Sequence, residues 1–295
     1  MTESHSSTCD KSTCGSCSTP CSESTAAPGV ESEDQRLQRR MGSIRHKILV
    51  MSGKGGVGKS TVAVNLAVSL LQAGKRVGLL DVDIHGPSIP QMLHLEDARA
   101  MGDGQSLLPL DFGNLKVMSI GFLLPSRDDA VVWRGPMKMT IIRQFLQDVE
   151  WGDLDYLVVD LPPGTGDEPL SVCQLATPVE GAVIVTTPQQ VSTSDVRRSI
   201  RFCQKLEIPV LGVVENMSGF VCPKCGETTH IFKTGGGEKM AADMQVPFLG
   251  RVPIDPEIGL ACDSGTPFVY GDAHTPSTRA FEQIAVAILS LSKNK

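Results

Sequence analysis

Short apolar runs, each ending in a polar or glycine-rich turn, recur along the chain after its first 47 residues. They cover residues 48–51, 77–80, 156–159, 181–185 and 210–214, and helix-length stretches separate several of them. Continuous apolar runs of this kind are typical of parallel strands that are covered on both faces. The pattern therefore predicts an α/β fold with a doubly wound, mostly parallel sheet, whose ligands bind at the carboxyl ends of the strands.

Two helices are predicted from the spacing of apolar residues. Residues 60–73 are apolar on most sides and are followed by Gly74, which indicates a buried helix with a glycine at its C-terminal end. Residues 277–291 place Phe281, Ile284, Ile288 and Leu291 on one face, as an amphipathic helix does. Residues 95–134 show no clear periodicity, and we expect loops and short strands there.

The N-terminal end has a different composition from the rest of the chain. Residues 1–34 are rich in Ser, Thr, Cys, Pro and Gly and almost lack large apolar side chains, so they form a flexible arm unless a metal ion folds them. Residues 35–46 are basic and are interpreted as a connector. The main domain is expected to span residues 47–295.

Composition and charge narrow the class of protein. The 295 residues are 41% hydrophobic and 20% charged, as in soluble globular proteins, and the formal net charge of −6 argues against a broad basic surface for nucleic acid. No apolar run approaches the roughly 18 residues that a membrane span requires, and no signal-peptide core is present. We therefore expect a cytoplasmic protein that binds neither membrane nor nucleic acid.

A phosphate-binding loop follows the first apolar run. The residues GKGGVGKS at positions 53–60 fit the pattern GxxxxGK[ST] between a predicted strand and a predicted helix, which is the context that the pattern requires. Backbone N–H groups of such a loop and the helix N-terminus face the phosphates of a nucleotide, while the lysine reaches the β and γ phosphates and the serine binds Mg²⁺. The expected nucleotide contacts are Gly53, Lys54, Gly55, Gly56, Val57, Gly58, Lys59, Ser60 and Thr61.

Carboxylates stand at the ends of two other predicted strands. Asp81 and Asp83 follow the second run, and Asp160 follows the third, directly before a glycine-rich loop at residues 161–168. One carboxylate in such a place holds Mg²⁺ directly or through water, and another orients the attacking water. Asp81 has two further interpretations, a helix cap and a surface charge.

The nine cysteines are unevenly distributed, and without a secretory signal clustered cysteines indicate metal ligands or redox groups. Cys222 and Cys225 form a CxxC pair, for which a redox disulfide, half of a zinc site and iron–sulfur ligation are all open. A zinc site within one chain needs further ligands, and His230 is the nearby candidate. Two thiolates from each of two chains would supply the four cysteines of a [4Fe–4S] cluster.

The other cysteines fall into two groups. Cys9, Cys14, Cys17 and Cys21 lie in the arm and suffice for a [4Fe–4S] cluster or a four-cysteine zinc site. Cys173, Cys203 and Cys262 stand alone in apolar stretches, and we expect them to pack as small hydrophobic residues.

From about residue 47 to the C-terminus the chain resembles the Mrp/NBP35-type iron–sulfur cluster carrier ATPases. The resemblance rests on the CxxC pair and on residues 53–61, 81–88, 133–136, 160–167 and 215–218. It implies a fold of the P-loop NTPase type and a slow ATPase that assembles a labile [4Fe–4S] cluster on Cys222 and Cys225 at a homodimer interface. The resemblance also implies that the cluster is then passed to apo iron–sulfur proteins.

The resemblance also implies roles for single residues. GKGGVGKS is similar to the variant phosphate loop shared with the nitrogenase iron protein and with septum-positioning and chromosome-partition ATPases, in which the lysine at the place of Lys54 reaches the nucleotide of the other subunit. Asp160 matches the metal-side aspartate and Asp83 the water-orienting one. Asn216 matches a residue that contacts the adenine, although an asparagine there also suits a local turn.

Three points stay open at the level of sequence. Some relatives carry a four-cysteine motif in an N-terminal arm with longer first and last gaps, so a second [4Fe–4S] cluster, zinc and no metal are alternatives for this arm. A partition or positioning ATPase that binds DNA or membrane, and an ATP-coupled redox protein, are alternative functions. Residues 133–136, WRGP, receive no role.

Overall fold

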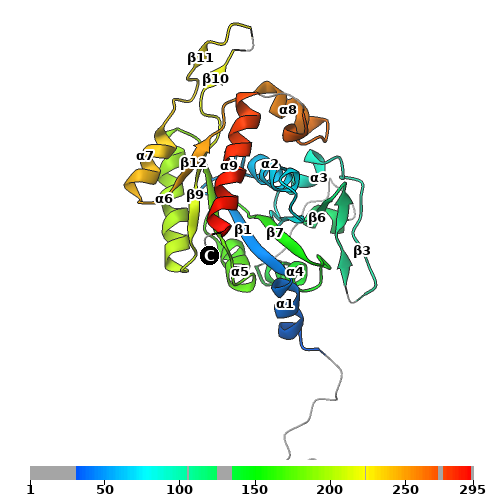
Figure 1. Cartoon of the computed structure of the whole chain (residues 1–295). Helices are drawn as coiled ribbons and strands as arrows, with labels where there is room; N and C mark the ends of the chain where they lie inside the picture. The colour runs from blue at the N-terminus through cyan, green and yellow to red at the C-terminus, as the bar shows by residue number, and fades with distance from the viewer. Residues whose placement is uncertain (1–30, 105, 125–134, 223, 272–274, 294–295) are drawn as a thin grey trace, which may run out of the picture. The chain divides into compact units, whose positions relative to one another are not determined.

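The computed structural model describes residues 31–104, 106–124, 135–222, 224–271 and 275–293. Its main feature is an eight-stranded sheet in the order β12, β9, β8, β1, β7, β2, β6, β5 (Figure 1). The strands are β1 (Ile44–Ser52), β2 (Val77–Asp81), β5 (Leu110–Phe112), β6 (Leu115–Ser119), β7 (Leu154–Asp160), β8 (Gly181–Thr186), β9 (Val210–Glu215) and β12 (Phe248–Arg251). All neighbours pair in parallel except β5, which is antiparallel to β6. The predicted fold class is confirmed.

Helices cover both faces of the sheet because the connections run in opposite directions along it. The chain moves one way from β1 to β2 and β6, and the other way from β7 to β8, β9 and β12, so right-handed crossovers place the two sets of helices on opposite faces. The helices are α1 (Glu33–Gly42), α2 (Lys59–Gln72), α3 (Ile89–Met92), α4 (Gly135–Gln147), α5 (Asp167–Leu175), α6 (Gln190–Lys205), α7 (Gly236–Asp243), α8 (Pro256–Asp263) and α9 (Pro276–Lys293). The direction of winding changes at β1, which places the carboxyl end of this strand at the switch point where ligands bind in such sheets.

Both helices predicted from the sequence are present. In α2, Val62, Leu66 and Leu70 are buried, and Gly74 follows with a φ of 77° that suits glycine. In α9, Phe281 and Ile288 are buried as expected, but Leu291 is 37% exposed. The apolar face of α9 that is buried therefore ends before Leu291.

The segment expected to be a connector belongs to the folded unit, which starts at Glu33. The first strand begins at Ile44, four residues before the apolar run that predicts it, and α1 buries Leu37 and Met41. Lys47 explains this difference: its buried ammonium donates to the carbonyls of Met41 at 2.9 Å and Ile44 at 3.3 Å, where α1 ends. Lys47, which directly follows the segment expected to be a connector, thus binds the end of the helix to the sheet, and burial lowers the pKa of Lys47.

Two 3₁₀ turns and two ribbons complete the fold. The 3₁₀ turns are η1 (Ile120–Leu123) and η2 (Phe268–Tyr270), and the ribbons pair β3 (Met101–Gly102) with β4 (Leu107–Leu108) and β10 (Phe220–Val221) with β11 (Thr228–Thr229). Short strands within residues 95–134 agree with the sequence expectation, and β6 joins the main sheet.

Within the described residues, none of the helices has both the length and the apolar character needed to cross a membrane.

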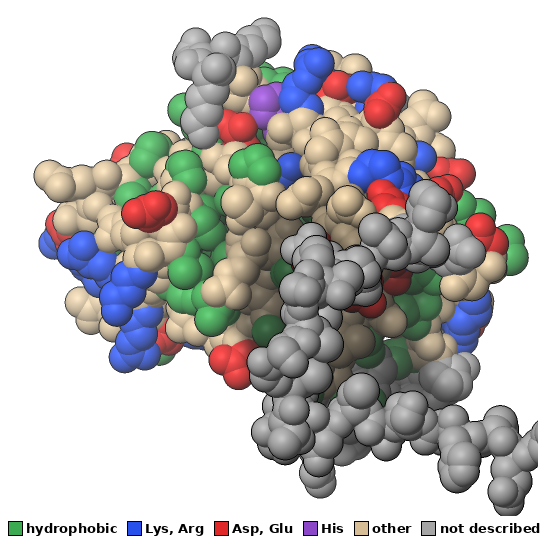
Figure 2. Space-filling model, turned by 90° about the horizontal axis from the view of Figure 1, so that it is seen from below, with side chains coloured by type: hydrophobic (Ala, Val, Ile, Leu, Met, Phe, Trp, Pro, Cys, Tyr) green, Lys and Arg blue, Asp and Glu red, His purple; other side chains and the backbone are tan. Residues whose placement is uncertain are grey.

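Basic side chains gather on α6 although the chain as a whole is acidic. Figure 2 shows lysine and arginine side chains together at the left edge of the lower face, on the side where α6 lies. Arg197, Arg198, Arg201 and Lys205 line a hollow beside the apolar Phe202 on this side. Two of these charges have acidic partners, since Arg197 contacts Asp243 at 2.5 Å and Arg198 contacts Asp195 at 3.3 Å. The basic face is therefore local and partly neutralised.

Candidate functional site

The glycine-rich loop connects β1 to α2 at the switch point of the sheet. Its lysine and serine both contact a carboxylate that ends the neighbouring strand β7: Lys59 Nζ lies 2.6 Å from Asp160 Oδ1, and Ser60 Oγ donates to Asp160 Oδ2 at 2.5 Å. Asp160 is fully buried, and Asp83 Oδ2 lies 3.8 Å from the same ammonium group. The structure thus brings together Lys59, Ser60, Asp83 and Asp160, as the sequence predicts.

A cavity of about 240 Å³ lies over this cluster. The glycine loop forms one wall, the loop that carries Asp83 forms a second, and Pro163 of the loop after β7 contributes to the lining. Lys54 also lines the cavity, and its carbonyl accepts a hydrogen bond from Ser52 Oγ at 2.9 Å. The backbone N–H groups of the loop and the start of α2 make this wall suitable for an anion such as a phosphate.

Asp81 shapes the loop that carries Asp83. Its two carboxyl oxygens accept hydrogen bonds from Asp83 N at 3.0 Å, Ser119 Oγ at 3.0 Å and Ile89 N at 3.4 Å. Ile89 is the first residue of α3, so Asp81 does contact a helix start, but its complete burial excludes the interpretation as a surface charge. Burial, with the nearby carboxylate of Asp160, raises the pKa of Asp81 to about 7.

The acidic cluster is short of positive charge. Burial raises the pKa of both Asp83 and Asp160, and the ammonium group of Lys59 opposes this effect at each of them. A divalent cation would favour the ionised carboxylates in the same way, and a serine hydroxyl beside a carboxylate is a donor set of the oxygen type that Mg²⁺ prefers. Ser60 and Asp160 therefore fit a magnesium ion.

Asn216 supports the glycine loop from the side. It follows β9, is buried, and donates from Nδ2 to the carbonyl of Val57 at 2.9 Å. A Cβ atom added to Gly58 would lie 2.2 Å from Asn216 Nδ2, and Gly58 has a φ of 79°, so both space and backbone require glycine here. An adenine contact by Asn216 remains a prediction, whereas its contact with the loop is an observed one.

A second ionic cluster, which involves the loop after Asp83, was missed at the level of sequence. Lys138 Nζ lies 2.7 Å from His85 Nε2 and 2.8 Å from Glu168 Oε1, and so connects α4 to the loop after Asp83 and to the start of α5. His85 stands in a segment that carries the family resemblance and Glu168 directly follows another, but Lys138 comes from a distant segment. Trp133 and Arg134, just before α4, lie outside the described residues.

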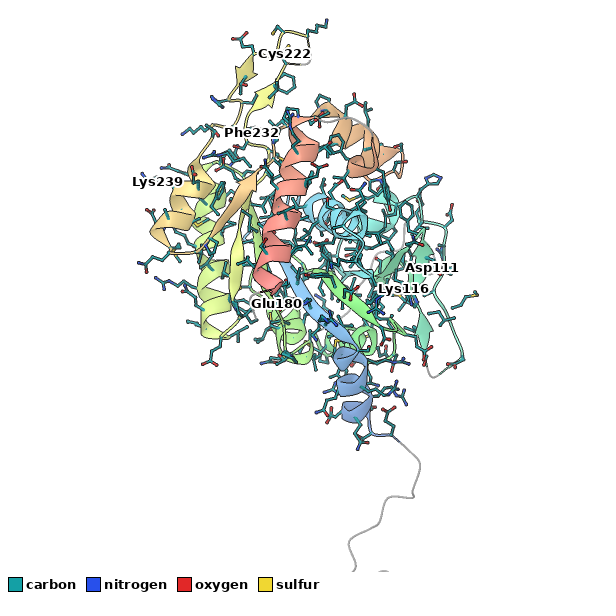
Figure 3. The ribbon with its side chains drawn as sticks, viewed as in Figure 1. Asp111, Lys116, Glu180, Cys222, Phe232 and Lys239 are labelled. Carbon is teal, nitrogen blue, oxygen red and sulfur yellow. The ribbon has the colours of Figure 1, made fainter. Side chains whose placement is uncertain are left out.

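Cys222 and Cys225 lie at the turn of the β10–β11 hairpin, which projects from the body of the protein (Figure 3). Within this turn Gly226 N donates to the carbonyl of Cys222 at 2.8 Å, and Cys222 N donates to the carbonyl of Glu227 at 2.9 Å. Hydrogen bonds from the backbone N–H groups of Cys225 and Lys224, together with the Cys225 thiol, lower the pKa of Cys222. A thiol with a lowered pKa yields the thiolate that binds metals.

No third ligand accompanies this pair in the described part of the chain, where no group of three or more His, Cys, Asp or Glu side chains is arranged to hold a metal ion. The alternative of a zinc site completed by His230 within one chain is therefore not supported there. The arm cysteines Cys9, Cys14, Cys17 and Cys21 lie outside the described residues.

The remaining cysteines agree with a packing role to different degrees. Cys173 and Cys203 are buried, and burial raises the pKa of each thiol to about 12, so both stay protonated at neutral pH. Cys262 is only partly buried, and burial raises its pKa as well. The prediction of buried hydrophobic packing holds for Cys173 and Cys203 and only in part for Cys262.

A parallel sheet whose first strand leads through GKGGVGKS into a helix, with carboxylates at the ends of the adjoining strands, defines the class of P-loop NTPases. Residues 43–289 match the family described as ParA, the NUBPL iron-transfer P-loop NTPases. The chain is 48% identical over 264 residues to the iron–sulfur cluster carrier protein of Methanocaldococcus jannaschii, and the alignment covers 89% of this chain and 90% of that protein.

Solved structures agree with this assignment. The nucleotide-binding protein of Archaeoglobus fulgidus, in complex with ADP, is 42% identical with a TM-score of 0.72, covering 83% of this chain and 95% of that one. The septum site-determining protein MinD of Pyrococcus horikoshii, in complex with Mg-ADP, shares the fold at 23% identity and a TM-score of 0.63, covering 84% of this chain and 97% of that one. The chain belongs to the NUBPL iron-transfer family of P-loop NTPases.

The pKa of Asp81 leads to a prediction about stability and pH. Because the folded protein binds this proton more tightly than an unfolded chain with the ordinary pKa of 3.8, the contribution is complete below about pH 4 and is lost as the pH rises to about 7. Asp81→Asn cannot ionise, so urea unfolding of the nucleotide-free protein should show a smaller loss of stability between about pH 5 and pH 8. Asp97→Asn, at an exposed position, is the control. Equal pH dependence in the wild type and Asp81→Asn would contradict the prediction.

The contacts of Lys59 lead to a second prediction. Lys59→Ala removes the ammonium group from the cavity, and hydrogen bonds to charged groups contribute about 1.5–3 kcal/mol, so ATP affinity should fall about 10- to 150-fold. Titration with a fluorescent ATP analogue measures this loss, and circular dichroism checks the fold because Asp160 loses its buried partner. Lys205→Ala, at the exposed end of α6, should bind ATP as the wild type does. Unchanged affinity in Lys59→Ala would place the nucleotide elsewhere.

Proposed function

We propose that this protein is an ATP-binding, slowly hydrolysing carrier that assembles a [4Fe–4S] cluster on Cys222 and Cys225 at a homodimer interface and transfers it to apo iron–sulfur proteins in the cytoplasm. One observation carries the proposal: a projecting thiol pair with no third protein ligand among the described residues stands on a P-loop NTPase of the iron-transfer family. The carrier from Methanocaldococcus jannaschii, at 48% identity, supports the same function.

The number of thiols supports the dimer. A [4Fe–4S] cluster takes four cysteine thiolates, and one hairpin offers two. Cys225 is exposed and Cys222 partly so, and a second copy of the hairpin therefore has access to both. The cluster is the cargo of the reaction, and exposed ligands suit a cluster that has to leave.

The second site lies in the nucleotide cavity. Phosphoryl transfer depends mainly on positioning and charge neutralisation. In this assignment the glycine loop holds the phosphates, Lys59 neutralises their charge, and Asp83 orients the attacking water. Mg²⁺ would be held by Ser60 and, directly or through water, by Asp160, and when bound it supplies further charge neutralisation. Lys54 lines the cavity, and in the dimer it would contact the nucleotide of the partner subunit.

The alternative of a DNA- or membrane-binding ATPase receives less support. The basic side chains of α6 are the feature that such a function would use, but Arg197 and Arg198 already contact carboxylates. The family match and the thiol pair instead favour a carrier. A redox protein would keep its cluster through many turnovers, whereas the exposed pair favours release.

The carrier function predicts that cluster content depends on the hairpin. After anaerobic reconstitution with iron and sulfide, a protein in which Cys222 and Cys225 are both replaced by Ala should lose about two iron atoms per chain and should not activate an apo iron–sulfur acceptor. Cys262→Ala, which removes a thiol outside the hairpin, is the matched control and should retain both properties. Unchanged iron content and transfer in the double variant would contradict the proposal.

For the arm we propose a second [4Fe–4S] cluster on Cys9, Cys14, Cys17 and Cys21, because four thiols in 13 consecutive positions suffice for all ligands of one cluster. A protein lacking residues 1–34 should then hold about four fewer iron atoms per chain than the full chain, with the hairpin cluster retained. Zinc in place of iron on the full chain, measured by elemental analysis, would contradict the assignment.

A further inference from the structure

The cysteine hairpin and the phosphate loop are attached to two consecutive residues at the end of one strand. β9 ends at Glu215, and Asn216 follows it; both are buried. Asn216 contacts the phosphate loop through the carbonyl of Val57, as described above. Glu215, the residue directly before Asn216, contacts the base of the hairpin.

The carboxyl group of Glu215 holds both ends of the hairpin segment, residues 218–235. At the entry, Ser218 Oγ donates to Glu215 Oε1 at 2.5 Å, and at the exit Gly235 N donates to the same oxygen at 2.8 Å. Gly237 N donates to Oε2. Ser218 Oγ also lies 2.9 Å from Thr234 Oγ1, so the two ends contact one another as well.

The glycine run at residues 235–237 allows this close approach. A Cβ atom on Gly237 would lie 3.0 Å from Glu215 Oε2 and 2.9 Å from a methyl group of Thr186. A Cβ atom on Gly236 would lie 2.1 Å from the carbonyl oxygen of Pro188, and Gly235 has a φ of 79°. Side chains at these positions would push the exit of the hairpin away from the carboxyl group, so the run has a structural purpose that the sequence analysis did not identify.

Glu215 holds the base of the hairpin firmly because its side chain is shielded from water. Its side chain is completely buried, and a buried carboxyl group requires hydrogen-bond partners in the protein. Besides the donors of the hairpin segment, the Arg251 guanidinium lies 3.6 Å from Oε1. A displacement of β9 at Glu215 therefore either moves the hairpin base with it or leaves buried donors and acceptors without partners, which is energetically unfavourable.

We propose that Glu215 is a positioning residue that couples the nucleotide site to the cysteine pair: a change in the phosphate loop reaches Asn216, and the adjoining Glu215 transmits it to the base of the hairpin that carries Cys222 and Cys225. The inference rests on the proposed carrier function for its purpose. It concerns the metal-free protein, however, and can be tested without a cluster.

The test measures how nucleotide changes thiol reactivity. The full-length, metal-free protein is treated with iodoacetamide without nucleotide, with ADP and with a non-hydrolysable ATP analogue, and peptide mass spectrometry gives the alkylation rates of Cys222 and Cys225. In the wild type the ATP analogue should change these rates about fivefold or more, in the range of ordinary coupling between two sites. A wild-type ratio of one would overturn the proposal.

Glu215→Gln removes the coupling while it preserves the size of the side chain, because an amide nitrogen faces backbone N–H donors that need an acceptor. The ratio of alkylation rates with and without the ATP analogue should become about one, while the nucleotide still binds. Glu238→Gln is the matched control, since Glu238 contacts Arg251 but not the hairpin base, and it should keep the wild-type ratio. A wild-type ratio in Glu215→Gln would overturn the proposal.

A milder variant covers the case in which Glu215→Gln does not fold or does not bind nucleotide. Ser218→Ala removes one of the donors to Glu215 together with the contact to Thr234, and it should bring the ratio closer to one without abolishing ATP binding. An unchanged ratio in Ser218→Ala would then overturn the proposal. Iron content after reconstitution, measured separately on the same variants, distinguishes failure of the coupling from failure of the carrier function.

Discussion

The structure depends on a buried carboxylate, Asp160, at the end of the strand beside the phosphate loop. A charge that is removed from water in this way is tolerated only with close partners, and Asp160 has two of them, Lys59 and Ser60. These are the last two residues of the GKGGVGKS loop, so the arrangement that compensates the buried charge also fixes the loop against the sheet. The same cluster is the one that a nucleotide and its cation would complete, which is why the site and the centre of the fold coincide.

The second functional region is built differently. The cysteine hairpin projects from the sheet, and its position is determined at its base, by the buried Glu215, rather than at its turn. A rigid base and an exposed turn suit a metal site that is shared and later emptied, because the ligands stay accessible while their spacing is maintained. Since Glu215 and Asn216 are adjacent, both functional regions are attached to the end of the same strand.

The sequence predicted the structure correctly where a local pattern determines it. The apolar runs predict the parallel strands, and the loop motif places Lys59 and Ser60 correctly because strand, loop and helix are contiguous. The sequence did not reveal the role of a residue where that role depends on a contact with a distant segment. The role of Lys47 in binding α1 to the sheet depends on carbonyls that are exposed only once the helix ends, and the Lys138 cluster joins three distant segments. Likewise, the glycine run at residues 235–237 is explained only by the approach of Glu215 and Pro188.

The central claim is that two copies of the hairpin share one cluster. The most direct test is analytical ultracentrifugation of the reconstituted protein with Cys9, Cys14, Cys17 and Cys21 replaced by Ser, recording protein and iron–sulfur absorbance together with an iron assay. We predict that the absorbance of the cluster sediments with a dimer that contains about four iron atoms per two chains. Cluster absorbance on a monomer with about four iron atoms per chain would contradict the account.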